Sequence, residues 1–199
     1  MPGNPAVASY VKLVRLKIVA LVVFTMVMAA WIAGGGAPAW RDAAHLIVGT
    51  TFVILGSLVL NHRLERRADG IMARTAERPL PRGRMTGTQA LLVGCSGAAG
   101  GLVYLAVACG RLFAVLAALA CLLYVVVYTL LKPLTPWQTP IGALAGALPV
   151  LMGAALASDV GSVMSTTLFG IAYFWQFPHA MAIAWLYRSQ YALAGVKVA

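Results

Sequence analysis

Six apolar stretches restrict how this chain of 199 residues can fold more than any other feature. They cover residues 16–34, 43–61, 89–109, 112–131, 138–158 and 164–187. Roughly 20 consecutive apolar residues cross the hydrocarbon core of a bilayer as a helix. A bilayer admits only helices and closed barrels, because only these satisfy every backbone polar group internally. The sequence therefore predicts an all-α integral membrane protein, a polytopic helical bundle with six spans.

Composition agrees with this fold class. The chain is 61% hydrophobic and 10% charged, whereas a soluble domain carries about 25% charged residues. No linker or low-complexity tract divides the sequence. Residues 1–199 are therefore predicted to form a single membrane domain in the lipid bilayer.

The basic residues are distributed unevenly between the two sides of the predicted bundle. If both termini are cytoplasmic, 13 of the 15 basic residues, Lys12 and Arg15 among them, fall in cytoplasmic segments. Only Arg41 and Arg111 then lie on the outer side. This division follows the positive-inside rule and accounts for the net charge of +10 without a polyanion. We therefore expect both termini in the cytoplasm and no nucleic-acid partner.

The longest connection is the basic segment 61–85, which contains seven arginines and three acids. Loops of this length inside compact proteins are commonly functional. Its first part, 61–75, is predicted to continue the second helix beyond the hydrocarbon. The Pro79, Pro81 and Gly83 cluster is then predicted to end helical structure before the third span.

Three polar residues in this segment share one helix face. Asn61, Glu65 and Asp69 are spaced at i, i+4 and i+8. Mg²⁺ typically takes one or two carboxylates together with substrate phosphate oxygens, so these three are the candidate catalytic and metal-binding residues. Cationic side chains nearby are candidate diphosphate ligands: Arg66, Arg74, Arg78 and Lys132. This pattern indicates an intramembrane enzyme acting on a prenyl diphosphate; a solvated helix end with basic anchors is the alternative.

A second polar group interrupts the sixth apolar stretch. Trp175, Gln176 and His179 surround Pro178, which is predicted to kink or break the span. An ionisable residue inside a span is costly and indicates function or a specific buried partner. A substrate cavity here, to which Tyr128 of the fourth stretch also contributes, is one interpretation. A hydrogen-bonding role in packing is the other.

Glycines recur at spacings typical of close helix packing in lipid. Gly97 and Gly101 form one small-xxx-small pair, and Gly142 and Gly146 form a second. Both pairs are predicted to serve helix packing.

The residues now described resemble the protoheme IX farnesyltransferases (haem O synthases) of the UbiA prenyltransferase superfamily. That family carries the pattern Asn-xxx-Asp-Arg-xx-Asp-xx-Met-x-Arg-Thr-xx-Arg-Pro-Leu. The chain has, in that register, Asn61, Glu65, Arg66, Asp69, Met72, Arg74, Thr75, Arg78, Pro79 and Leu80. The likeness continues through 128–149, 174–184 and 191–195, and the 174–184 block favours the haem-directed branch over quinone-directed ones.

The resemblance implies Mg²⁺-dependent transfer of a farnesyl group from farnesyl diphosphate to a vinyl group of haem b, giving haem O for haem-copper oxidases. It also implies a bacterial-type inner (cytoplasmic) membrane location, with haem A synthase or terminal oxidase assembly factors as candidate partners. Residues expected in the haem pocket are Tyr128, Trp175, Gln176 and His179.

The chain departs from the family pattern at three places. Glu65 stands where the family has aspartate, Arg67 replaces a further aspartate, and Gln190 replaces the acid that usually precedes Tyr191. Family members have about nine spans, so the chain is expected to lack C-terminal spans. Two alternatives follow: an inactive or haem-binding relative in oxidase assembly, or a quinone-directed UbiA-type prenyltransferase.

Overall fold

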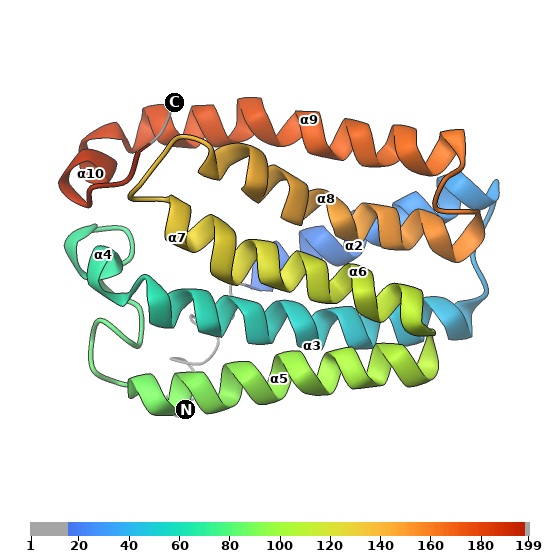
Figure 1. The fold of residues 1–199 in the computed structure, drawn as a ribbon, viewed down its shortest axis with the longest axis horizontal. Helices are drawn as coiled ribbons and strands as arrows, with labels where there is room; N and C mark the ends of the chain where they lie inside the picture. The colour runs from blue at the N-terminus through green and yellow to red at the C-terminus, as the bar shows by residue number, and fades with distance from the viewer. Residues whose placement is uncertain (1–15, 198–199) are drawn as a thin grey trace, which may run out of the picture.

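A computed structural model describes residues 16–197, which form helices joined by turns (Figure 1). The long helices are α2 (Leu16–Gly34), α3 (Trp40–Leu64), α5 (Gly87–Ala108), α6 (Arg111–Leu122), α8 (Gln138–Ala157) and α9 (Val163–Leu186). Shorter elements are α4 (Arg66–Ile71), the π-helix η1 (Leu123–Tyr128), α7 (Thr129–Leu131) and α10 (Arg188–Leu193). The predicted all-helical bundle is confirmed.

The six predicted stretches all form helices, but five meet both the length and the hydropathy expected of a membrane span. These are α2, α3, α5, α8 and the continuous unit Arg111–Leu131, searched among the described residues. The remaining helix, α9, has 24 residues and packs along α8. Helix α9, which contains the polar residues Gln176 and His179, is long enough but does not meet the hydropathy expected of a span, so the structure supports five candidate spans where six were predicted.

The two ends of the bundle differ in character. The turns that join α2 to α3, α5 to α6 and α8 to α9 lie at one end, while α4, the end of α7 and α10 gather at the other (Figure 1). The basic segment 63–84, Lys132 and Arg188 therefore share one end of the molecule. Lys12 and Arg15, and the termini themselves, lie outside the described residues.

The extension of the second helix is shorter than predicted. Helix α3 ends at Leu64, and α4 ends at Ile71 instead of near residue 75. Met72 has extended backbone angles (φ −83°, ψ 121°), which end the helix. Pro178, by contrast, lies inside an unbroken α9, so its predicted break does not occur.

Glycines bring pairs of helices into backbone contact. A Cβ at Gly56 of α3 would lie 2.4 Å from the backbone nitrogen of Ala98 in α5. A Cβ at Gly153 of α8 would lie 1.9 Å from the carbonyl oxygen of Met26 in α2. Gly97 is also part of this packing, because a Cβ there would lie 3.4 Å from the Cα of Gly56. These contacts confirm the predicted packing role of Gly97.

We expect Gly153→Ala to destabilise the bundle strongly, because the added methyl group collides with the backbone of α2, which cannot move aside as a side chain can. Overpacking of this kind costs about 1–3 kcal/mol or more. Thermal unfolding of the purified protein in detergent measures the effect. Gly100→Ala is the matched control, because a Cβ there meets nothing within 4 Å. Equal stability of the two variants would contradict this account of the α2–α8 contact.

Candidate active site

A central cavity of about 1380 Å³ lies between the helices. Residues of α2, α3, α4, η1, α8 and α9 line it. Pockets for drug-sized ligands measure about 300–1,000 Å³, so this cavity has room for more than one such molecule. Most of its wall is apolar, and its charged side chains come from the α4 end of the bundle.

Asn61, Glu65 and Asp69 line this cavity together. The change from α3 to α4 does not disturb their spacing. The Glu65 N–H donates to the Asn61 carbonyl oxygen at 2.9 Å, and the Asp69 N–H donates to the Glu65 carbonyl oxygen at 2.8 Å. Two successive i to i+4 hydrogen bonds keep the three residues on one face.

Asp69 is a buried carboxylate with one paired and one unpaired oxygen. Its side chain is 1% exposed, and Arg78 Nη1 donates to Oδ2 at 2.5 Å. Oδ1 is buried without a hydrogen-bond partner. Burial raises the pKa of Asp69 above its ordinary value, and the charge of Arg78 offsets part of that effect. An unpaired buried carboxylate oxygen is costly and marks a position where a cation fits.

Glu65 forms an ion pair with Lys132, which follows α7. Lys132 Nζ also lies 4.4 Å from the centre of the Tyr128 ring, within cation–π range. Burial alone would lower the pKa of Lys132, but Tyr128 and Glu65 outweigh it and raise that pKa above its ordinary value. Lys132 is therefore a permanent cation at the cavity wall.

The donor set suits a magnesium ion that shares its coordination with a diphosphate. Among residues 16–197, no group of three or more His, Cys, Asp or Glu side chains is arranged to hold a metal alone. Glu65 and Asp69 would contribute carboxylates, and Asn61 would contribute its amide. Mg²⁺ normally keeps few protein carboxylates and completes its shell with phosphate oxygens and water. The residues fit that ion together with a phosphate substrate.

Four cationic side chains line the cavity near these acids: Arg67, Arg74, Arg78 and Lys132. Three of them are the predicted diphosphate ligands. Arg66 is not placed on the cavity wall; its guanidinium packs near Gly87 at the start of α5 instead, 3.3 Å from where a Cβ would stand. Arg67 lines the cavity instead. The sequence did not indicate this residue, because position 67 lies off the Asn61 face of a regular helix.

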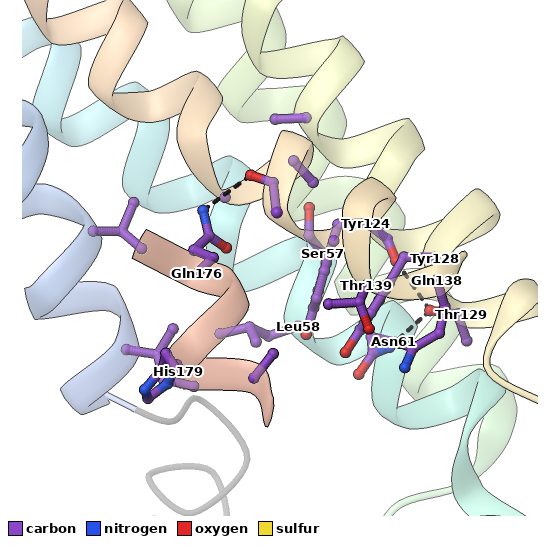
Figure 2. A pocket seen from close by; sticks show the side chains of 18 of the residues that line it. Ser57, Leu58, Asn61, Tyr124, Tyr128, Thr129, Gln138, Thr139, Gln176 and His179 are labelled. Atoms are coloured by element: carbon purple, nitrogen blue, oxygen red, sulfur yellow. Dashed lines mark hydrogen bonds between the residues drawn. The ribbon is translucent and has the colours of Figure 1, made fainter. Parts of the chain in front are cut away.

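The predicted haem-pocket residues all line the same cavity: Trp175, Gln176 and His179 from α9, and Tyr128 from η1. Trp175 and His179 stack with ring centres 5.0 Å apart and an angle of 12° between planes. The Gln176 amide nitrogen donates to the carbonyl oxygens of Ala143 (2.9 Å) and Ala172 (3.3 Å). Figure 2 shows Gln176 and His179 on one side of the cavity and Asn61 with its neighbours on the other.

The second predicted glycine pair makes room for two of these side chains. A Cβ at Gly142 would lie 2.8 Å from the Tyr128 ring, and a Cβ at Gly146 would lie 2.4 Å from the Gln176 amide oxygen. The pair therefore serves close helix packing, as predicted, and the groups packed against it are cavity side chains from η1 and α9.

Helix α10 and the residues after it close over this end of the bundle. The Arg74 N–H lies 3.5 Å from the Gln190 side-chain oxygen, and the Arg74 guanidinium lies 4.9 Å from the Tyr187 ring centre. The Lys197 N–H donates to the Lys132 carbonyl oxygen at 2.8 Å. The C-terminal segment thus contacts both loops that carry cationic side chains.

Thr129 also lines the cavity, although the sequence did not indicate it. Its hydroxyl accepts a hydrogen bond from the Asn61 side-chain nitrogen at 2.8 Å. It adjoins Tyr128 inside the matching segment 128–149, but nothing in its sequence position indicates that it contacts Asn61.

Comparison with known proteins identifies what this arrangement is similar to. The sequence profile of the UbiA prenyltransferase family matches residues 22–198. A protoheme IX farnesyltransferase of Rhodopirellula baltica is 39% identical over 93% of this chain and 65% of its own length. Another, from Koribacter versatilis, is 37% identical over 98% of this chain and 65% of its own length. The chain spans about two thirds of the length of these curated relatives.

The fold is also found in solved structures. A UbiA homologue from Archaeoglobus fulgidus, bound to DMAPP and Mg²⁺, superposes with a TM-score of 0.77 at 20% identity. The match covers 96% of this chain and 67% of the homologue. The sequence profile, the relatives and the fold agree, and the chain belongs to the UbiA prenyltransferase family.

Proposed function

We propose that the protein transfers a farnesyl group from farnesyl diphosphate to a vinyl group of haem b and so forms haem O. The observation that carries this proposal is the composition of the central cavity. Two carboxylates and four cations lie at one end, and a stacked Trp175–His179 pair lies in the same cavity. The relatives named protoheme IX farnesyltransferase support the haem acceptor over a quinone precursor.

Asn61, Glu65 and Asp69 would hold Mg²⁺, which, when bound, neutralises diphosphate charge and stabilises it as a leaving group. Arg78 and Lys132, which neutralise Asp69 and Glu65 in this structure, would bind phosphate oxygens of the substrate. Arg67 and Arg74 add two further cations to the same wall. The preorganised positive charge favours departure of pyrophosphate.

The proposed transfer exchanges a carbon–oxygen bond of the substrate for a carbon–carbon bond. The bond between farnesyl C1 and oxygen breaks, and its electron pair leaves with pyrophosphate. The vinyl π electrons form the new carbon–carbon bond to C1. Water adds to the remaining electron-deficient vinyl carbon and loses a proton to the pyrophosphate or to solvent, which leaves a hydroxyl group. The apolar walls around Trp175 and Gln176 would limit water elsewhere in the cavity.

We further propose that the α4 end of the bundle faces the cytoplasm. Segment 63–84, Lys132 and Arg188 lie at this end, whereas Arg41 and Arg111 begin helices at the opposite end (Figure 1). This arrangement follows the positive-inside rule. Farnesyl diphosphate would then enter from the cytoplasm.

Product analysis tests the proposed reaction. The purified chain is incubated in detergent with haem b, farnesyl diphosphate and Mg²⁺, and the haem fraction is examined by mass spectrometry. Haem O above the level of a protein-free control supports the proposal. Haem binding without haem O, unchanged in Glu65→Asp and Gln190→Asp variants, would instead identify a haem-binding relative. A prenylated quinone precursor and no haem O would identify a quinone-directed enzyme.

Asp69→Asn should lower haem O formation by about 100-fold or more, because it removes the carboxylate with the unpaired oxygen at the cation position. The rate of haem O formation is the measurement, with circular dichroism to verify helical content. Asp159→Asn is the matched control, because Asp159 lies in the exposed turn between α8 and α9. Activity in Asp69→Asn equal to that of the control would refute the assigned role.

His179→Ala should weaken haem b binding more than farnesyl diphosphate binding, because the imidazole stacks on Trp175 within the acceptor part of the cavity. Haem titration by visible absorbance and a separate diphosphate-binding measurement give the two affinities. Phe174→Ala serves as control, since this side chain is 70% exposed on the outer face of α9. Equal loss of both ligands in His179→Ala would rule out this division of the cavity.

A further inference from the structure

The π-helical turn η1 creates an unusual hydrogen bond just before the cationic loop. The Thr129 hydroxyl donates to the carbonyl oxygen of Tyr124, five residues earlier, at 3.0 Å. In a regular α-helix a threonine hydroxyl reaches the carbonyl three or four residues back. The wider π-turn (Leu123–Tyr128) moves this contact to the fifth residue. Such turns are frequent at functional sites.

The hydrogen bond from Thr129 to Tyr124 determines the direction of the hydrogen bond between Thr129 and Asn61. A carbonyl oxygen can only accept, so the single proton of the Thr129 hydroxyl is directed to Tyr124. The hydroxyl oxygen can then only accept from Asn61, whose side-chain nitrogen lies 2.8 Å away. The amide of Asn61 must therefore turn its NH₂ group toward Thr129. The identity of the two amide atoms follows from the hydrogen-bond network itself.

The orientation of this amide determines whether Asn61 presents its side-chain oxygen or its NH₂ group to the cavity. With the NH₂ group bound to Thr129, the side-chain oxygen is the atom left for a ligand. A reversed amide would present hydrogen atoms carrying partial positive charge beside Glu65 and Asp69, where a divalent cation is expected. The oxygen attracts a cation and the NH₂ group repels it.

We propose that Thr129 is a positioning residue, which fixes the Asn61 amide so that its oxygen binds the divalent cation that accompanies the diphosphate. The chain of contacts runs from the Tyr124 carbonyl through the Thr129 hydroxyl to Asn61 (Figure 2). Both Asn61 and Thr129 are buried, at 3% and 7% exposure, so water does not readily replace the missing partner. The inference rests on the magnesium part of the proposed function and not on the identity of the acceptor.

Divalent-cation binding tests this role without turnover. Mn²⁺ replaces Mg²⁺ as the probe, inorganic pyrophosphate replaces the substrate, and electron paramagnetic resonance counts free and bound Mn²⁺ on the full chain in detergent. Thr129→Val keeps the side-chain shape but removes the hydroxyl, and should weaken Mn²⁺ affinity about 10- to 100-fold, as loss of a partner behind a metal ligand does. Thr129→Ser keeps the hydroxyl and should stay within about threefold of the unaltered chain.

A double-variant comparison separates positioning from general damage. Asn61→Ala should weaken Mn²⁺ binding, and adding Thr129→Val to it should cause no further loss, because Thr129 acts through Asn61. Ser57→Ala is the control: Ser57 also lines the cavity, but its hydroxyl donates to Val53 of its own helix. Thermal unfolding of each variant is measured alongside.

Four results would overturn the proposal. Unaltered affinity in Thr129→Val would show that the amide orients without the hydroxyl. Equal losses in Thr129→Ser and Thr129→Val, or independent losses in the double variant, would show a structural effect. Absence of Mn²⁺ binding by the unaltered chain would reject this inference together with the metal part of the proposed function, whereas haem O formation is measured separately.

Discussion

Two ion pairs, Asp69–Arg78 and Glu65–Lys132, hold together the charged end of the cavity. Asp69 is almost fully buried and Glu65 is largely so. Removing one partner from a buried ion pair costs about 3–5 kcal/mol, so neither acid tolerates the loss of its cation. Arg78 comes from the loop after α4, and Lys132 comes from the loop after α7. The two pairs therefore tie both loops to the face that carries Asn61.

The other polar contacts at this end follow from that anchoring. With Arg78 held by Asp69, the loop bearing Arg74 lies against Gln190 and Tyr187 of the α10 region. With Lys132 held by Glu65, its backbone carbonyl accepts from Lys197. The cations exceed the acids on the cavity wall, so the site attracts a polyanion even while both acids are neutralised. On the proposed function, Mg²⁺ would replace Arg78 and Lys132 beside the two acids. The diphosphate would replace the acids as the partner of these two cations.

The part of the cavity around Tyr128 and Gln176, which would bind the acceptor on the proposed function, is built from close helix packing. Gly142 and Gly146 leave space for Tyr128 and Gln176, and the backbone of α8 and α9 binds the Gln176 amide nitrogen. A polar side chain in hydrocarbon needs such a partner because no water is present.

The sequence alone determined the helical membrane bundle, the ends of its helices within a few residues, and the Asn61, Glu65 and Asp69 face, because apolar length and helical spacing are local properties. It selected Arg66 and not Arg67 for the cavity wall, since it could not show that Arg66 lies against Gly87 at the start of α5. It could not reveal Thr129, which meets Asn61 across 68 positions of chain. Those features were decided by tertiary structure, because they depend on a π-turn and on helices brought together by packing.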